Sequence, residues 1–117
     1  MSVTITVPMI PPSVNSYVRH SRGRHFKTPE ASRFLETLVA CARGAGAVSG
    51  KGYGVAIIIW LGKGDRGDID NFPKLVLDGL VLAGVIDTDS KVVVLLIRKH
   101  RDADNPRTEI IVSETEL

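Results

Sequence analysis

The aspartates of residues 65–91 are the side chains best suited to chemistry in this chain. The stretch holds six of the thirteen acidic residues, and two of its pairs, Asp68/Asp70 and Asp87/Asp89, share the spacing i, i+2. In extended backbone such residues point to the same side, about 6.6 Å apart. Converging carboxylates repel one another unless a cation holds them. Oxygen ligands without nearby His or Cys suit Mg²⁺ or Mn²⁺.

Helix capping offers a plainer explanation for part of this pattern. Asn71 fits the N-cap of a following helix because Lys74 then supplies the N3 amide. A cap at Asp70 would instead place Pro73, which has no N–H, at N3. Capping therefore accounts for Asn71 and leaves Asp68 and Asp70 unexplained. The second pair also fits ordinary turn residues.

The elements around the two pairs are expected to bring them together. Residues 55–60 form an apolar run that predicts a strand in the centre of a sheet, and residues 61–67 lead from it to the first pair. Leucines and a valine at helical spacing then predict a helix of about three turns, which ends at Gly84. A strand, a turn, a helix and a second turn can place both acidic ends at one site.

The remaining segments predict an α+β fold with one domain over residues 1–117. Residues 2–7 alternate as a strand, and Thr28 and Pro29 begin an amphipathic helix over 29–43. Residues 91–99 and 108–114 are two more strands, which we expect to pair as a hairpin because their connection is short. The order β-α-β-α-β-β indicates a mixed β-sheet packed with two helices.

Composition excludes several classes of protein. The chain has 117 residues, 44% of them hydrophobic, and its apolar runs are too short to cross a bilayer. The first residues lack the charged and apolar regions of a signal peptide. A single cysteine, Cys41, excludes an internal disulfide and a cysteine-rich zinc site. We therefore expect a cytoplasmic protein with no membrane partner.

Basic residues flank the acidic centre on both sides. One cluster lies in 17–27, a segment that predicts a loop or loose hairpin with Gly23 near its tip, and the other is the run 98–101. This distribution suits a polyanion held by its phosphates while a metal site acts on it. Tyr17 and Phe26 are available for base stacking. A solvated basic loop explains the first cluster equally well.

The chain resembles the RusA family of Holliday-junction resolvases from about Pro11 to Val94. The resemblance rests on PPSVNSYVRH (11–20), the RGR of 22–24, DIDNFPK (68–74), DGLVLAG (78–84) and an acid at Asp89 followed by Lys91-Val92-Val93. Each motif is weak alone, but together, in this order and at these separations, they are specific.

The resemblance implies a crossover junction endodeoxyribonuclease of bacterial or phage origin that works as a homodimer in recombination and repair. It would use Mg²⁺, with Mn²⁺ as a substitute, and nick two opposed strands of a four-way DNA junction. The catalytic residues would be Asp68, Asp70, Asp89 and Lys74, and the three aspartates would be the metal ligands. The DNA contacts would come from Asn15, Tyr17, Arg19, His20, Arg22, Arg24, Lys27, Asn71 and Lys74.

Three positions depart from the family pattern. Gly67 stands before the first acid, where a basic residue is common, and Thr88 replaces a frequent second acid. Pro73 enters the helix, but proline is tolerated in a first turn.

Three other functions remain open at this stage. One is a branched-DNA-binding module without catalysis, and another is a nuclease of the same fold that acts on flaps or replication forks. The third is an aspartyl-phosphate phosphatase, whose motif also begins with D-x-D after a hydrophobic strand. Here GKGDRG separates the strand from the acids, and the chain is short for that fold.

Overall fold

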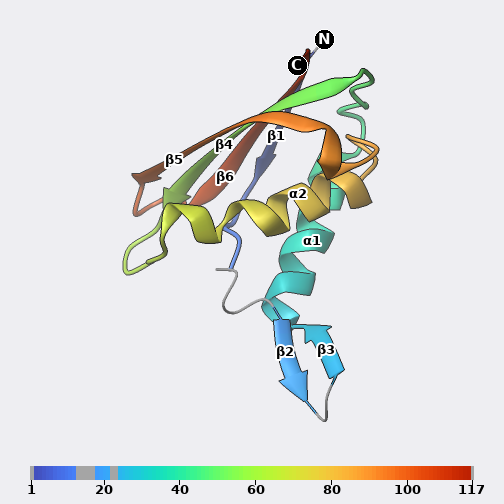
Figure 1. Ribbon diagram of the computed structural model, residues 1–117. Helices are drawn as coiled ribbons and strands as arrows, with labels where there is room; N and C mark the ends of the chain where they lie inside the picture. The colour runs from blue at the N-terminus through green and yellow to red at the C-terminus, as the bar shows by residue number, and fades with distance from the viewer. Residues whose placement is uncertain (1, 13–17, 22–23, 117) are drawn as a thin grey trace.

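The computed structural model describes residues 2–12, 18–21 and 24–116, and it shows an α+β domain (Figure 1). The class and the order of the main elements agree with the prediction from the sequence. In chain order the elements are β1 (Ser2–Val7), β2 (Val18–Ser21), β3 (Arg24–Lys27), α1 (Pro29–Ala42), β4 (Gly52–Leu61), the 3₁₀ turn η2 (Ile69–Asn71), α2 (Pro73–Leu82), the 3₁₀ turn η3 (Asp89–Lys91), β5 (Val92–Arg101) and β6 (Arg107–Thr115).

The main sheet has four strands in the order β1-β6-β4-β5, with β4 parallel to β5 and antiparallel to β6. The prediction that β4 is central is confirmed, but the predicted hairpin between β5 and β6 is wrong. The apolar strand β4 lies between them, and its backbone forms hydrogen bonds with β5 on one edge and with β6 on the other. The connection over 102–106 crosses the end of β4, and the Asp102 amide donates to the Leu61 carbonyl at 2.8 Å.

Both helices cover one face of the sheet (Figure 1). On that face β4 buries a row of alternate residues, Tyr53, Val55, Ile57, Ile59 and Leu61. The residues between them are only half-buried, so this apolar strand is fully buried on the helix side alone. The opposite face of the sheet exposes apolar side chains of its own: Val94, Leu96 and Ile111.

The ends of the helices follow their local sequence in part. Thr28 caps α1 as predicted, accepting a hydrogen bond from the Ala31 amide at 3.3 Å. The predicted cap at Asn71 is wrong, because Phe72 is the N-cap of α2 and makes no side-chain cap bond. Turn η2 instead runs almost directly into the helix. The predicted stop at Gly84 is confirmed by its φ of +74°.

Strands β2 and β3 pair as a separate antiparallel ribbon. Over 18–21 and 24–27, the described part of the segment 17–27, the predicted loop or loose hairpin is thus a hairpin. Gly23, expected at its tip, lies outside the described residues. Figure 1 shows the hairpin projecting beyond the start of α1, away from the main sheet. Within the part of the chain that the structure describes, no helix has the length and apolar character needed to cross a membrane.

Candidate active site

The first acidic pair follows a tight loop, residues 62–67, that leaves the end of β4. The Asp65 carboxylate accepts a hydrogen bond from the Gly62 amide at 2.7 Å, and the Asp65 amide donates back to the Gly62 carbonyl at 3.1 Å. The loop ends at Asp68, the N-cap position of η2, whose side chain makes no cap bond. Asp68 and Asp70 are both exposed, and no described residue bonds either carboxylate. Capping therefore does not explain these two acids.

Gly67 is required by the shape of this loop. Its φ is +152°, which disfavours any residue with a side chain, and a Cβ atom there would run into the ring of Phe72. Phe72 is 1% exposed and belongs to the core. The absence of a basic residue before the first acid thus has a structural cause in this chain.

The second acidic pair is divided between two sets of partners. Asp87 accepts a hydrogen bond from the Tyr53 hydroxyl at 2.6 Å and from the Lys91 ammonium at 2.7 Å. The Lys91 bond, followed by the Tyr53 bond, lowers the pKa of the Asp87 carboxyl from its usual 3.8 to about 2. The same contacts raise the pKa of Tyr53 and of Lys91. Asp87 therefore anchors its turn to the start of β4.

Thr88 fixes the turn that carries Asp89. Its hydroxyl oxygen accepts a hydrogen bond from the Ser90 amide at 3.3 Å, and it caps η3, in which Asp89 is the first residue. The threonine that replaces an acid in the family pattern thus has a local structural role.

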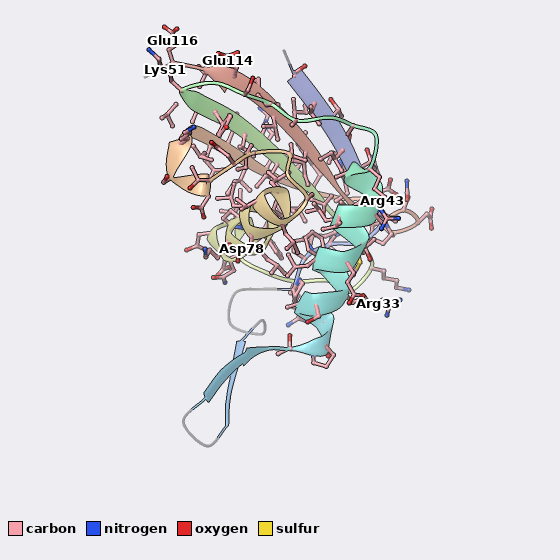
Figure 2. All side chains as sticks on the ribbon, turned by 90° about the vertical axis from the view of Figure 1, so that its right-hand side faces the viewer. Arg33, Arg43, Lys51, Asp78, Glu114 and Glu116 are labelled. Atoms are coloured by element: carbon pink, nitrogen blue, oxygen red, sulfur yellow. The ribbon has the colours of Figure 1, made fainter. Side chains whose placement is uncertain are left out.

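Lys74, in the first turn of α2, joins the second acidic turn to the start of the helix. Its ammonium lies 2.9 Å from an Asp78 carboxylate oxygen and 3.7 Å from one of Asp89. Figure 2 shows Asp78 on the side of α2 that faces away from α1. Asp89 is therefore held beside the helix that begins three residues after Asp70. Lys74 makes these contacts although about half of its side chain is exposed.

The three predicted metal ligands are not gathered at coordination distance. Among residues 2–12, 18–21 and 24–116, no group of three or more His, Cys, Asp or Glu side chains is arranged to hold a metal ion. The structure brings Asp89 to Lys74 and leaves the carboxylates of Asp68 and Asp70 on the exposed turn before the helix. The donor set, made only of carboxylate oxygens, has the chemistry that Mg²⁺ prefers.

Most of the predicted DNA-binding residues lie either on the hairpin β2–β3 or outside the residues that the structure describes. Asn15, Tyr17 and Arg22 lie outside the described residues. Arg19 and His20 lie on β2, and Arg24 and Lys27 lie on β3. Asn71 is half-buried at the end of η2.

Sequence reasoning treated the basic run 98–101 as one surface, but the strand divides it. Lys99 and Arg101 donate to backbone carbonyls of the loop 62–67. His100 points to the opposite face, where it stacks on Trp60 with ring centroids 4.7 Å apart. The alternation of side chains along a strand was the signal that could have separated them.

Comparison with known proteins identifies the family of this chain. The family model described as Endodeoxyribonuclease RusA matches residues 8–113. The crossover junction endodeoxyribonuclease RusA of Escherichia coli (strain K12) is 32% identical over 113 residues, covering 95% of this chain and 93% of that protein. The protein of the same name from Shigella sonnei (strain Ss046) has the same identity and coverage. That of Enterobacteria phage 82 is 32% identical over 112 residues, covering 94% and 92%. The chain belongs to the RusA family of endodeoxyribonucleases.

Proposed function

We propose that the protein is a Mg²⁺-dependent endodeoxyribonuclease that resolves four-way DNA junctions by paired nicking, in the cytoplasm of a bacterial cell. The relatives' name, crossover junction endodeoxyribonuclease, supports the substrate class. The observation that carries the proposal is the ion pair of Lys74 with Asp89 at 3.7 Å. It ties the second acidic turn to the helix that directly follows the first one.

Asp68, Asp70 and Asp89 would hold the metal ion, and Mn²⁺ would substitute for Mg²⁺. Two of these carboxylates are exposed and bonded to no described residue. Their side chains can therefore reorient around a cation without disturbing the core. A bound Mg²⁺ ion supplies an activated water and polarises the phosphate that is attacked.

Lys74 supports cleavage by placing a positive charge beside the acids. When a phosphate enters, the ammonium can neutralise the charge that builds up on its oxygens. The N-terminus of α2 adds the positive end of the helix dipole at the same place. Asp78, within 2.9 Å of Lys74, keeps the ammonium on this side of the helix.

The hairpin β2–β3 would grip the DNA. It carries Arg19 and His20 on one strand and Arg24 and Lys27 on the other, and it projects from the body of the protein (Figure 1). A projecting basic hairpin can follow the phosphates of a DNA arm while the acids lie at the junction. Asn15, Tyr17, Arg22 and Asn71 complete the proposed DNA contacts.

Two copies of the chain would act together. A four-way junction offers two symmetry-related phosphates, and one chain carries one set of acids. Strand β5 is an edge strand with three consecutive apolar residues that are 54%, 43% and 48% exposed: Val94, Leu95 and Leu96. An uncovered apolar edge of this kind is a favourable surface for pairing with a second chain. On α2, Leu82 is also exposed.

Cleavage of a synthetic four-way junction tests the function directly. The protein should nick two opposed strands of the junction with Mg²⁺, and it should leave a linear duplex of the same sequence intact. Without a divalent ion it should bind the junction and not cut it. Cleavage of flaps or forks in preference to the junction would assign a different branched substrate. Binding without cleavage under every metal condition would show a non-catalytic binding module.

A further inference from the structure

The row of β5 side chains that faces the helices changes character along the strand. Leu95 and Ile97 are apolar, and the next two residues of the same row are Lys99 and Arg101. Lys99 and Arg101 are exposed at the end of this apolar row, beside the loop 62–67. Their charged donors are therefore within reach of that loop.

The loop 62–67 supplies hydrogen-bond partners for both side chains. The Arg101 guanidinium donates to the Gly62 carbonyl at 2.6 Å and to the Asp65 carbonyl at 3.2 Å. The Lys99 ammonium donates to the Gly67 carbonyl at 2.9 Å. These bonds fix the first residue of the loop, its middle and its last residue, and the residue that follows is Asp68.

The loop has few other means of holding its shape. Lys63, Gly64 and Arg66 are exposed, and Gly64 has a positive φ of +82°. Among the described residues, the carbonyls of Gly62, Asp65 and Gly67 accept hydrogen bonds from side chains of β5. Bonds from a charged donor are stronger than those between neutral groups, so they suit a segment whose middle residues are exposed.

We propose that Lys99 and Arg101 are positioning residues, which hold the loop 62–67 and thereby set the place of the Asp68 carboxylate. The inference rests on the proposed metal-dependent cleavage, in which Asp68 is a ligand. This positioning role differs from the interpretation that the basic residues of 98–101 contact DNA phosphates. Lys99 and Arg101 direct their donors to backbone carbonyls of the protein itself.

The two roles predict opposite results in DNA binding. A lysine or arginine that contacts a phosphate contributes about 0.9 to the slope of log K against log[salt] on duplex arms. A positioning residue contributes nothing to this slope. Its removal instead weakens the metal site, and residues that orient metal ligands typically change metal affinity by about 10–100-fold.

The test compares Lys99→Met and Arg101→Met with the control Arg98→Met, which removes a positive charge from the opposite face of the same strand. Hydrogen exchange of the amides over 62–68, measured without metal, should become roughly tenfold faster in the first two variants. It should be unchanged in the control. Mn²⁺ affinity, measured by electron paramagnetic resonance without DNA, should fall by about 10–100-fold in the same two variants. The milder variant Lys99→Arg keeps a charged donor. Its hydrogen exchange over 62–68 and its Mn²⁺ affinity should therefore stay close to those of wild type.

Unchanged exchange in both Met variants would overturn the inference. So would a salt slope reduced by about 0.9 with Mn²⁺ affinity intact, since that is the signature of a phosphate contact. Asp70→Asn separates the inference from the proposed function. If this variant binds Mn²⁺ as the wild type does, the metal assignment is wrong. Faster hydrogen exchange in Lys99→Met would still show that the hydrogen bond from Lys99 holds the loop 62–67.

Discussion

Asp87 and Asp89 lie two residues apart, but the structure gives them different tasks. Asp87 is bonded to Tyr53 and Lys91 and anchors its turn, whereas Asp89 reaches Lys74 beside the proposed metal site. The spacing of the two acids predicted a shared side and did not reveal this division. Tyr53 lies 34 positions before Asp87 in the chain, and local spacing carries no sign of such a partner.

The bonds of Asp87 make stability depend on pH in a defined direction. Its pKa in the folded protein is about 2, below the usual 3.8. The stabilisation is therefore complete above about pH 4 and is lost as the pH falls through about 2. In urea unfolding, wild type should be more stable than Asp87→Asn from about pH 5 to 7, and the difference should shrink toward zero near pH 2. The control Asp104→Asn, in an exposed turn, should show no such convergence. A constant difference across the whole range would contradict the assigned bonds.

Gly67 gives a second prediction at the scale of one residue. Gly67→Ala should destabilise the protein by about 1–3 kcal/mol, because the added methyl group overlaps the Phe72 ring. Gly64→Ala is the matched control, since Gly64 also has a positive φ but no atom within 4 Å of an added Cβ. Gly64→Ala should lose only about 1 kcal/mol of stability, which is the cost of placing a residue with a side chain at a positive φ. Equal destabilisation of the two variants, measured by chemical denaturation, would show that the ring contact is unimportant.

At the scale of elements, local patterns predicted the secondary structure better than they predicted the pairing of strands. The strand over 2–7 and the start of α1 at Pro29 follow from alternation and capping, which are properties of neighbouring residues. The prediction that β5 and β6 form a hairpin was wrong because β4 occupies the position between them in the sheet. Asn71 does not cap α2, because η2 continues into the helix through Phe72.

The hairpin β2–β3 is the element whose function is tested most easily. Changing Arg19 and Arg24 together to Ala should reduce the slope of log K against log[salt] for junction binding by roughly 0.9 for each phosphate that the variant no longer binds. The control pair is Arg33→Ala with Arg43→Ala, which removes the same charge from α1 and from its C-cap, where both side chains are exposed (Figure 2). If both pairs give the wild-type slope, the hairpin is only a solvated surface.

At the scale of the whole molecule, the uncovered edge of β5 predicts a dimer. Light scattering at micromolar concentration should give twice the mass of the chain. Leu96→Lys should shift the protein to monomer, because it places a charge in the apolar edge. Thr4→Lys, on the edge strand at the other side of the sheet, should remain dimeric. A monomeric wild type that still cuts both strands of a junction would contradict the two-copy arrangement.

The candidate site could be predicted in its residue types more fully than in its geometry. The acids and Lys74 are marked by motif and spacing. The supports of the two acidic turns come from distant strands, and only the folded chain brings them there: Tyr53 from β4, and Lys99 and Arg101 from β5. Their carbonyl and carboxylate partners leave no pattern in the sequence.

Junction cleavage by Asp70→Asn tests the central claim, that the exposed acids before α2 hold a catalytic metal ion. The variant should bind a four-way junction at least as tightly as wild type, because it removes a negative charge near the phosphates. With Mg²⁺ its cleavage rate should fall by at least about a hundredfold, while Asp104→Asn should cut at the wild-type rate. Cleavage by Asp70→Asn at close to the wild-type rate would contradict the metal assignment.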